Sequence, residues 1–214
     1  GFNNFFSSIA KNLNSKLYSS KPVNERDKTK EKFTKYLHKR VSCSMFLYEC
    51  SSEEISRIIK EFENGKASDL PLAALKKCAN RISGHLSGYI NNFMKQGIFP
   101  GLLKIGKITP VFKKGDTQLL DNYRPISIIP IFGKIFEKVI YDRLYSFFIS
   151  NNVIYDKQFG FRKYHSTSHA INFSVNKIID EIKIRNHVLG IFIDLSKAFD
   201  TIDHSKLIVK LENY

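Results

Sequence analysis

Apolar residues recur at helical spacing between residues 51 and 97 of this chain. Ser51 and Glu54 form a capping-box pair, in which each side chain can accept a hydrogen bond from the other residue's backbone N–H at the start of a helix. The apolar positions after this pair are Ile55, Ile58, Ile59 and Phe62. Their spacing predicts an amphipathic helix that ends near Asn64-Gly65.

Two further helices are predicted before residue 100. Pro71 suits the first turn of one of them, because the missing N–H of proline costs nothing there. Apolar side chains at helical spacing predict the other, and they are Ile82, Leu86, Ile90 and Phe93. Gly97 marks its end. A helix is also predicted near Phe5 to Leu17, within a leader rich in Lys, Asn and Ser.

The pattern changes from helical to extended at Lys107. Lys114-Gly115-Asp116 has the composition of a turn, and a second extended segment runs from Arg124 to Ile129. These segments predict a β-hairpin with a long, polar connection.

Two helices and one strand are predicted in the rest of the chain. Apolar positions over 135–147 predict a first helix, and Ser166 or Thr167 can cap a second that runs to Ile182. The run Val188 to Ile193 is rich in β-branched and aromatic residues, which predicts a buried strand.

Asp194 comes directly after this apolar strand. A carboxylate in that position must be solvated, paired or bound to a cation, because burying it alone is very costly. Strand, acidic residue and turn together are one way in which a sheet presents a metal-binding carboxylate. The alternative is a surface aspartate that ends the strand and caps the turn or short helix after it.

The charge balance indicates a polyanionic partner. The 214 residues carry a net charge of +14, and 43% of them are hydrophobic, which excludes wholesale disorder. An excess of this size favours a nucleic acid or an acidic membrane surface over charge that serves only solubility. No apolar stretch is long enough to span a bilayer, and no signal peptide is visible, so no membrane-spanning segment is expected.

The cysteines predict neither disulfides nor a zinc site. Their number, three, is odd, and no secretory signal precedes them. His38, Cys43 and Cys50 have a spacing that matches no usual zinc pattern, so ordinary reduced thiols are expected.

The sequence Phe192-Ile-Asp-Leu-Ser-Lys-Ala-Phe-Asp-Thr-Ile-Asp-His204 resembles the first catalytic motif of reverse transcriptases of non-LTR (LINE-type, jockey-like) retrotransposons. The resemblance implies that Asp194, helped by the backbone carbonyl of Leu195, binds catalytic Mg²⁺. It also implies that Phe199 lies under the sugar of the incoming nucleotide and disfavours a 2′-hydroxyl.

Further segments resemble the same family in the same order. They are Lys107 to Asp116, Asn122 to Lys138, Gln158 to Arg162 with Ser166-Thr167, and the N-terminal Phe2-Asn-Asn-Phe-Phe6. The resemblance implies an α+β right-hand polymerase fragment, in which helical and hairpin fingers lead into the first strand of the palm. Its expected parts are a basic leader or linker after an upstream endonuclease (1–50), the fingers and their connection to the palm (51–187), and the start of a truncated palm (188–214).

Basic residues of the predicted hairpin are the candidate nucleotide ligands. In the resembled family they close over the triphosphate, which implies this role for Lys113, Lys114 and Arg124. Arg124 is favoured because a guanidinium binds phosphate through two parallel hydrogen bonds. The two lysines could equally be a solvated turn.

The segment Gln158 to Arg162 holds the candidate template or nucleotide contacts, which are Gln158, Gly160 and Arg162. Phe159 and Phe161 are expected to pack in the core. Phe161 could instead stack on a base, as aromatic side chains do on single strands.

The resemblance implies an RNA-directed DNA polymerase that uses Mg²⁺, an RNA template, a DNA primer or target, and deoxynucleoside triphosphates. The second acidic motif of the family does not occur in residues 1–214, so this fragment alone is expected to be inactive. One alternative is a non-catalytic, nucleic-acid-binding remnant of a retrotransposon, and another is a basic interaction module that binds no nucleotide. An intracellular, nuclear location is implied by the family, and protein partners are not indicated.

Overall fold

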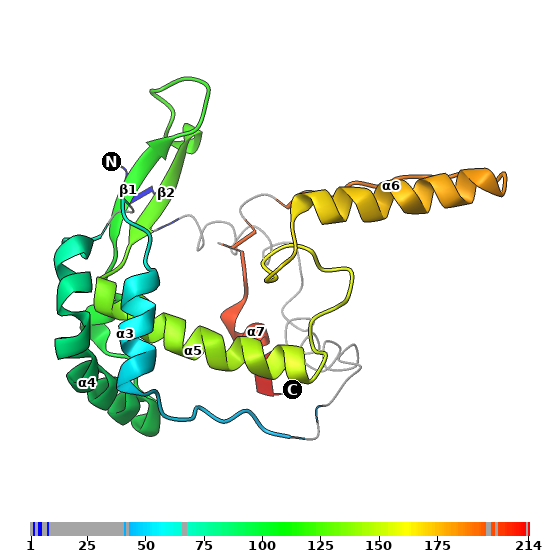
Figure 1. The fold of residues 1–214 in the computed structure, drawn as a ribbon. Helices are drawn as coiled ribbons and strands as arrows, with labels where there is room; N and C mark the ends of the chain where they lie inside the picture. Colours follow the sequence, from blue (N-terminus) through cyan, green and yellow to red (C-terminus); the bar gives the residue numbers. More distant parts are fainter. Residues whose placement is uncertain are drawn as a thin grey trace, which may run out of the picture. The chain divides into compact units, whose positions relative to one another are not determined.

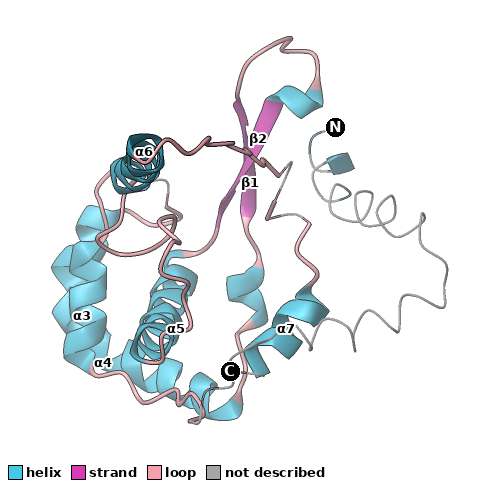
Figure 2. Ribbon diagram, turned by 90° about the vertical axis from the view of Figure 1, so that its right-hand side faces the viewer, coloured by secondary structure: helices cyan, strands magenta, loops and turns pink. Residues whose placement is uncertain are grey.

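A computed structural model describes residues 2, 4, 5, 8, 41, 43–65, 68–195, 198, 199, 201–212 and 214 (Figures 1 and 2). The chain divides into two compact units, one formed by Gly1–Asp27 and Ser42–Phe147, the other by Lys28–Val41 and Phe148–Tyr214. Most of the helix predicted near Phe5 to Leu17 lies outside the described residues.

The first predicted helix is α3, Ser52–Glu61. The Ser51 hydroxyl accepts a hydrogen bond from the backbone N–H of Glu54 over 3.2 Å, which confirms half of the capping box. The other half is replaced, because the Glu54 carboxylate binds Arg143 instead. The helix ends at Glu61, and the turn after it contains Gly65 in the left-handed region at φ 86°.

The second and third predicted helices form one continuous helix, α4, Leu72–Gln96. Pro71 occupies its N-cap, and Gly97, at φ 65°, ends it by donating its N–H to Met94. The prediction of a break was wrong because residues 72–81 contain neither proline nor glycine, so nothing interrupts the helix before Ile82.

The hydrophobic core of the first unit lies where α3, α4 and α5, Ile131–Ser150, meet. Its buried apolar residues are Cys50, Ile55, Ile58, Ile59, Leu75, Ala79, Ile90, Ile131, Ile135, Phe136 and Val139. Each fully buried isoleucine contributes about 1.5–3 kcal/mol. Asp69 fixes the start of α5, because its carboxylate accepts a hydrogen bond from the Ile131 N–H over 2.8 Å.

Cys50 belongs to this core rather than to the surface. Its thiol donates to the Asn91 side-chain oxygen over 3.2 Å, and the same oxygen accepts from the Cys50 N–H over 2.8 Å. Burial, reinforced by the nearby Glu54 carboxylate, raises the pKa of the Cys50 thiol to about 11. The thiol therefore stays protonated at neutral pH and serves packing.

The predicted hairpin is present. Strand β1, Lys107–Phe112, pairs antiparallel with β2, Tyr123–Ile128, and these two strands form the one sheet of the described residues. Short 3-10 helices lie before β1, at Gly101–Lys104, and before β2, at Leu120–Asn122. Figure 2 shows the two crossed strands in magenta.

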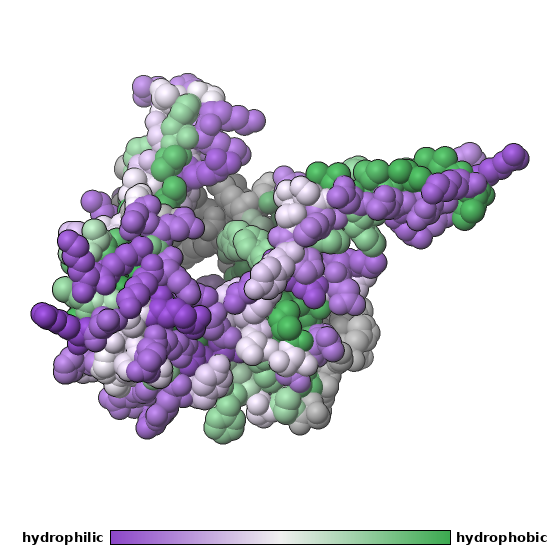
Figure 3. Space-filling view, in the orientation of Figure 1, coloured by the Kyte–Doolittle hydropathy of each residue, from purple (hydrophilic) through white to green (hydrophobic). Residues whose placement is uncertain are grey.

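The second unit contains α6, Thr167–Lys183, and α7, His204–Glu212. Ser166 caps α6 as predicted, since its hydroxyl accepts from the His169 N–H over 3.3 Å. Asp203 caps α7, because its carboxylate accepts from the Ser205 N–H over 3.0 Å. No residue of either helix is buried, and apolar side chains are visible along α6 in Figure 3.

The buried strand predicted over 188–193 is not formed. Residues 186–195 have no regular secondary structure, and their apolar side chains are exposed, with Phe192 at 98% and Leu189 at 86%. A strand is held by ladder hydrogen bonds to a neighbouring strand. Of the described residues, only β1 and β2 have such a partner. The structure thus combines helices with a small antiparallel sheet, which agrees with the α+β class.

Candidate nucleotide-binding and metal-binding residues

The register of the hairpin places two of the predicted basic residues on one face. Val111 lies opposite Arg124, and the Lys113 N–H continues the pairing by donating to the Asn122 carbonyl over 2.8 Å. Side chains of directly opposed residues share a face, and the next pair lies on the other face. Lys113 and Arg124 therefore project from the same face. As diagonal neighbours, their Cα atoms are expected to lie about 7–8 Å apart.

Aromatic side chains occupy the opposite face of the hairpin. The rings of Phe112 and Tyr123 meet edge to face with centroids 5.4 Å apart, and Phe2 packs on Tyr123 at 4.9 Å. These rings therefore do not cover the face that carries Lys113 and Arg124.

Side-chain hydrogen bonds hold the connection between the strands. The Asn122 amide donates to the Asp116 carbonyl over 2.8 Å, and the Tyr123 hydroxyl donates to the Thr117 carbonyl over 3.0 Å. Gly115 has φ 94°, and a Cβ added there would lie 2.8 Å from the Asn122 side chain. The turn therefore requires glycine, and its neighbour Lys114 lies in the turn itself.

The cationic groups of the hairpin have no acidic partner among the described residues. Lys113, Lys114 and Arg124 are all exposed and form no ion pair there. Three unneutralised cations on a single hairpin attract a polyanion and can form charge-assisted hydrogen bonds with it.

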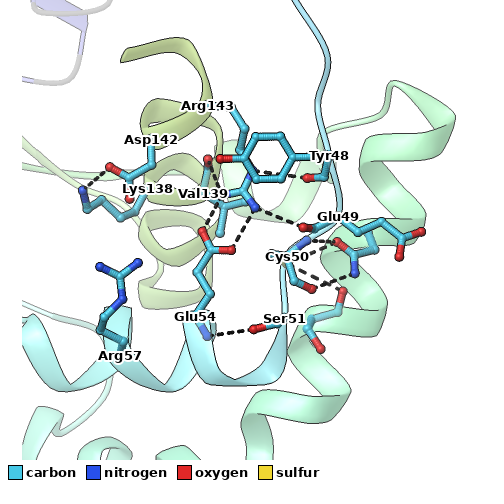
Figure 4. Close-up of polar contacts among 12 residues, drawn as sticks. Tyr48, Glu49, Cys50, Ser51, Glu54, Arg57, Lys138, Val139, Asp142 and Arg143 are labelled. Carbon is cyan, nitrogen blue, oxygen red and sulfur yellow. Dashed lines mark hydrogen bonds and ion pairs between the residues drawn. The ribbon is translucent and has the colours of Figure 1, made fainter. Parts of the chain in front are cut away.

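Arg143 shows the contrasting case of a fully paired cation (Figure 4). Its side chain is 1% exposed and forms a two-pronged ion pair with Glu54, whose second oxygen accepts over 2.8 Å. The guanidinium also donates to the carbonyls of Tyr48, Glu49 and Val139, and it lies 4.3 Å from the Tyr48 ring centroid. The hydrogen bonds to Glu54 are the largest cause of a raised pKa of Arg143, and the charge of the Glu54 carboxylate adds to the rise. Arg143 therefore ties the segment before α3 to α5 and is not a ligand residue.

The segment Gln158 to Arg162 forms a tight turn in the second unit. The Gln158 amide donates to the Gly160 carbonyl over 3.2 Å, and the Arg162 guanidinium donates to the Asp156 carbonyl over 3.5 Å. The side chains of Gln158 and Arg162 are thus both engaged in the turn, and the Arg162 bond is at the long limit for a hydrogen bond.

The two phenylalanines of this turn differ. Phe159 packs against Phe173 of α6, with centroids 5.8 Å apart, as predicted. Phe161 is 85% exposed, so its assignment to the core was wrong. Its backbone lies in the left-handed region at φ 59°, and its ring meets that of Phe199.

Phe199 and Asp194 are both exposed. The Phe199 ring is 72% exposed and meets Phe161 edge to face, with centroids 5.8 Å apart. Asp194 and Leu195 lie in the extended segment, and Asp194 makes no hydrogen bond or ion pair with a described residue. Asp200 lies outside the described residues.

The described part of the chain does not by itself form a magnesium site. It contains no group of three or more His, Cys, Asp or Glu side chains that could hold a metal ion. Mg²⁺ prefers octahedral oxygen coordination, and a lone exposed carboxylate supplies too few ligands to hold it against water. Asp194 is chemically suited to be one ligand of a larger set.

The structure brings the sequence candidates into two groups, one in each compact unit. Lys113 and Arg124 share a face of the hairpin, and Phe161 and Phe199 form a ring pair. The second pairing was missed from sequence because the residues are far apart in the chain. The order of the motifs is the sequence signal that could have suggested this pairing, because both residues lie in segments that resemble the polymerase family.

Comparison with known proteins agrees with these motifs. Residues 111–214 match the model of the reverse transcriptase (RNA-dependent DNA polymerase) family. This segment begins within β1 and includes every candidate residue named above. Residues 111–214 are thus similar to reverse transcriptases.

Relatives from retrotransposons extend the match toward the N-terminus. The chain is 29% identical over 179 residues to the RNA-directed DNA polymerase from mobile element jockey of Drosophila melanogaster, which covers 82% of the chain and 20% of that protein. It is 29% identical over 164 residues to the probable RNA-directed DNA polymerase from transposon BS of the same species, covering 75% of the chain and 18% of that protein. The chain thus spans at most 20% of the length of these relatives.

The similarity to non-LTR retrotransposon polymerases is therefore confirmed as predicted. None of the described helices combines the length and the apolar composition that a membrane span requires.

Proposed function

We propose that this chain is a nucleotide-binding and template-binding part of an RNA-directed DNA polymerase of a non-LTR retrotransposon. The supporting observation is the family match over 111–214, which contains both the basic hairpin and the motif with Asp194 and Phe199. The ligands are a deoxynucleoside triphosphate, an RNA template and a DNA primer or target. A nuclear site of action would follow from this function.

The hairpin supplies the triphosphate ligands in this proposal. Arg124 binds two phosphate oxygens in parallel, because the guanidinium fork matches their spacing. Lys113, on the same face, adds a mobile point charge, and Lys114 in the turn adds a third cation. Together they stabilise the negative charge that develops during phosphoryl transfer.

Asp194 and the Leu195 carbonyl are proposed as oxygen ligands for Mg²⁺, in a set that needs further carboxylates. The metal would bridge protein and phosphate oxygens when the site is complete. Asp194 is accessible for this role, since no described residue neutralises it.

Template or nucleotide contacts are proposed for Gln158, Gly160 and Arg162. The turn that holds them leaves the Phe161 ring exposed, and an exposed ring can stack on any base. In domain terms, we propose a leader over 1–50, fingers and connection over 51–187, and the start of the palm over 188–214.

Primer extension tests the proposed function. An extended form that includes the polymerase region of the longer relatives should synthesise DNA on a primed RNA template, whereas residues 1–214 alone should not, because one carboxylate cannot hold the metal ions. Robust extension by residues 1–214 would contradict the incomplete metal site. RNA binding without synthesis by the extended form would support a non-catalytic remnant instead.

Phe199→Val should admit ribonucleotides in the extended form. A smaller side chain leaves room for a 2′-hydroxyl, and because the ring is 72% exposed, its loss should cost little stability. The measurement is the ratio of ribonucleotide to deoxyribonucleotide incorporation. Phe161→Val is the matched control, since it removes the other ring of the pair. Unchanged discrimination in a folded Phe199→Val variant would exclude the sugar-gate role.

A further inference from the structure

An open cleft of about 1020 Å³ lies between α3 and α4 in the first unit. Its lining residues are Ser52, Glu53, Ser56, Arg57, Lys60 and Glu61 of α3, with Asn80, Arg81, Ser83, Gly84 and His85 of α4. None of these residues has an aliphatic or aromatic hydrocarbon side chain. The cleft therefore offers polar and charged groups to a ligand.

Two hydrogen bonds hold the side-chain oxygen of Asn80, a residue that lines this cleft. Its oxygen accepts from the Ser56 hydroxyl over 2.7 Å and from the Lys60 ammonium over 2.9 Å. An ammonium group only donates, so the amide oxygen must face Lys60. The amide nitrogen then points the other way, and no described residue accepts a hydrogen bond from it.

The acidic side chains of the cleft are already engaged. Glu61 pairs with Arg57 over 3.7 Å, and Glu53 accepts from the Ser52 hydroxyl over 2.8 Å. Hydrogen bonds from Ser51 and Ser52 also lower the pKa of Glu53, so it remains ionised. These two carboxylates offset two of the cleft's three permanent cations.

The basic residues on the α4 side are not engaged. Arg81 and His85 lie one helical turn apart, so they share a face, and neither makes a hydrogen bond or ion pair with a described residue. Together with Lys60 and the Asn80 amide, they are a group of hydrogen-bond donors. The described residues offer fewer acceptors than these donors could use.

We propose that the α3–α4 cleft binds the phosphodiester backbone of a single-stranded nucleic acid. The donors suit phosphate oxygens, and the open shape admits a continuous strand. The proposal rests on the proposed function, which supplies the nucleic acid, and adds a binding surface outside the family-matched segment 111–214. The cleft recognises charge and not sequence.

The test uses the full chain and a labelled oligouridine RNA of about 20 nucleotides. Binding is measured from about 50 mM to about 200 mM salt, where the affinity of the unaltered chain should fall steeply. Arg81→Gln should weaken binding several-fold and reduce the slope of log affinity against log salt by about 0.7, the share of one phosphate contact on a single strand. Arg81→Lys should restore most of the slope.

Lys76→Gln is the matched control, because it removes one charge from the same helix outside the cleft lining. Equal losses of RNA affinity in Arg81→Gln and Lys76→Gln would overturn the proposed binding site in the cleft, since only the total charge of the chain would then matter. Uridine monophosphate serves as a competitor at the same total phosphate concentration as the RNA. If it displaces the RNA, the proposed strand-binding site is overturned, because the cleft would then bind small phosphates. An unaltered chain that does not bind RNA would overturn the proposed function itself. Arg81 is exposed, so the variant should keep its fold, which thermal unfolding checks.

Discussion

Asp194→Asn should reduce DNA synthesis by the extended polymerase form more than about 100-fold. Loss of a residue that only orients a metal ligand costs about 10–100-fold, and loss of the ligand itself should exceed that range. Asparagine keeps the size of the side chain and removes the charge that binds the cation. The measurement is single-turnover primer extension on an RNA template at saturating Mg²⁺.

The fold should survive this substitution. Asp194 makes no hydrogen bond or ion pair with a described residue, so its charge stabilises no described contact. Asp180→Asn is the matched control, because Asp180 is an exposed aspartate on α6 with only a 3.5 Å ion pair to Lys183. Asp180→Asn should leave synthesis unchanged. Synthesis by Asp194→Asn at the unaltered rate would exclude Asp194 as a metal ligand.

Arg143→Met should lower the free energy of unfolding of the first unit by about 3–5 kcal/mol. The substitution leaves the Glu54 carboxylate without its cation, and it also removes the donors to the Tyr48, Glu49 and Val139 carbonyls. A loss of this size is a large fraction of the roughly 5–15 kcal/mol that holds a typical domain folded. The measurement is urea unfolding monitored by circular dichroism.

Two further variants separate the ion pair from general charge loss. Glu54→Gln combined with Arg143→Met should recover part of the stability, because no ionised partner then remains. Lys138→Met removes a cation on α5 that pairs with Asp142 over 2.7 Å in a half-buried setting, and it should cost only about 0.3–1 kcal/mol. Equal losses from Lys138→Met and Arg143→Met would contradict the structural role of the buried pair.

Local chemistry determined the ends of several elements from sequence alone. Ser51, Gly97 and Ser166 begin or end the predicted helices because their side chains or backbone freedom satisfy unpaired groups at helix ends. The turn around Gly115 likewise predicted the hairpin. The order of motifs was sufficient to predict the family, which the comparison confirms over 111–214. Such features depend on neighbours in the chain, so the sequence carries them directly.

Long-range partners decided the remainder. The sequence could not show that Glu54 would leave its capping box for Arg143, which is 89 positions away. It could not place Phe161 beside Phe199, nor Lys60 and Asn80 across one cleft. The run over 188–193 has the composition of a buried strand, yet it stays exposed because composition supplies only a propensity, whereas a strand needs a neighbour for its hydrogen bonds. The sequence by itself determined several helix ends, the hairpin turn and the similarity to reverse transcriptases, while the tertiary structure decided which distant side chains meet, because those contacts depend on how the elements pack.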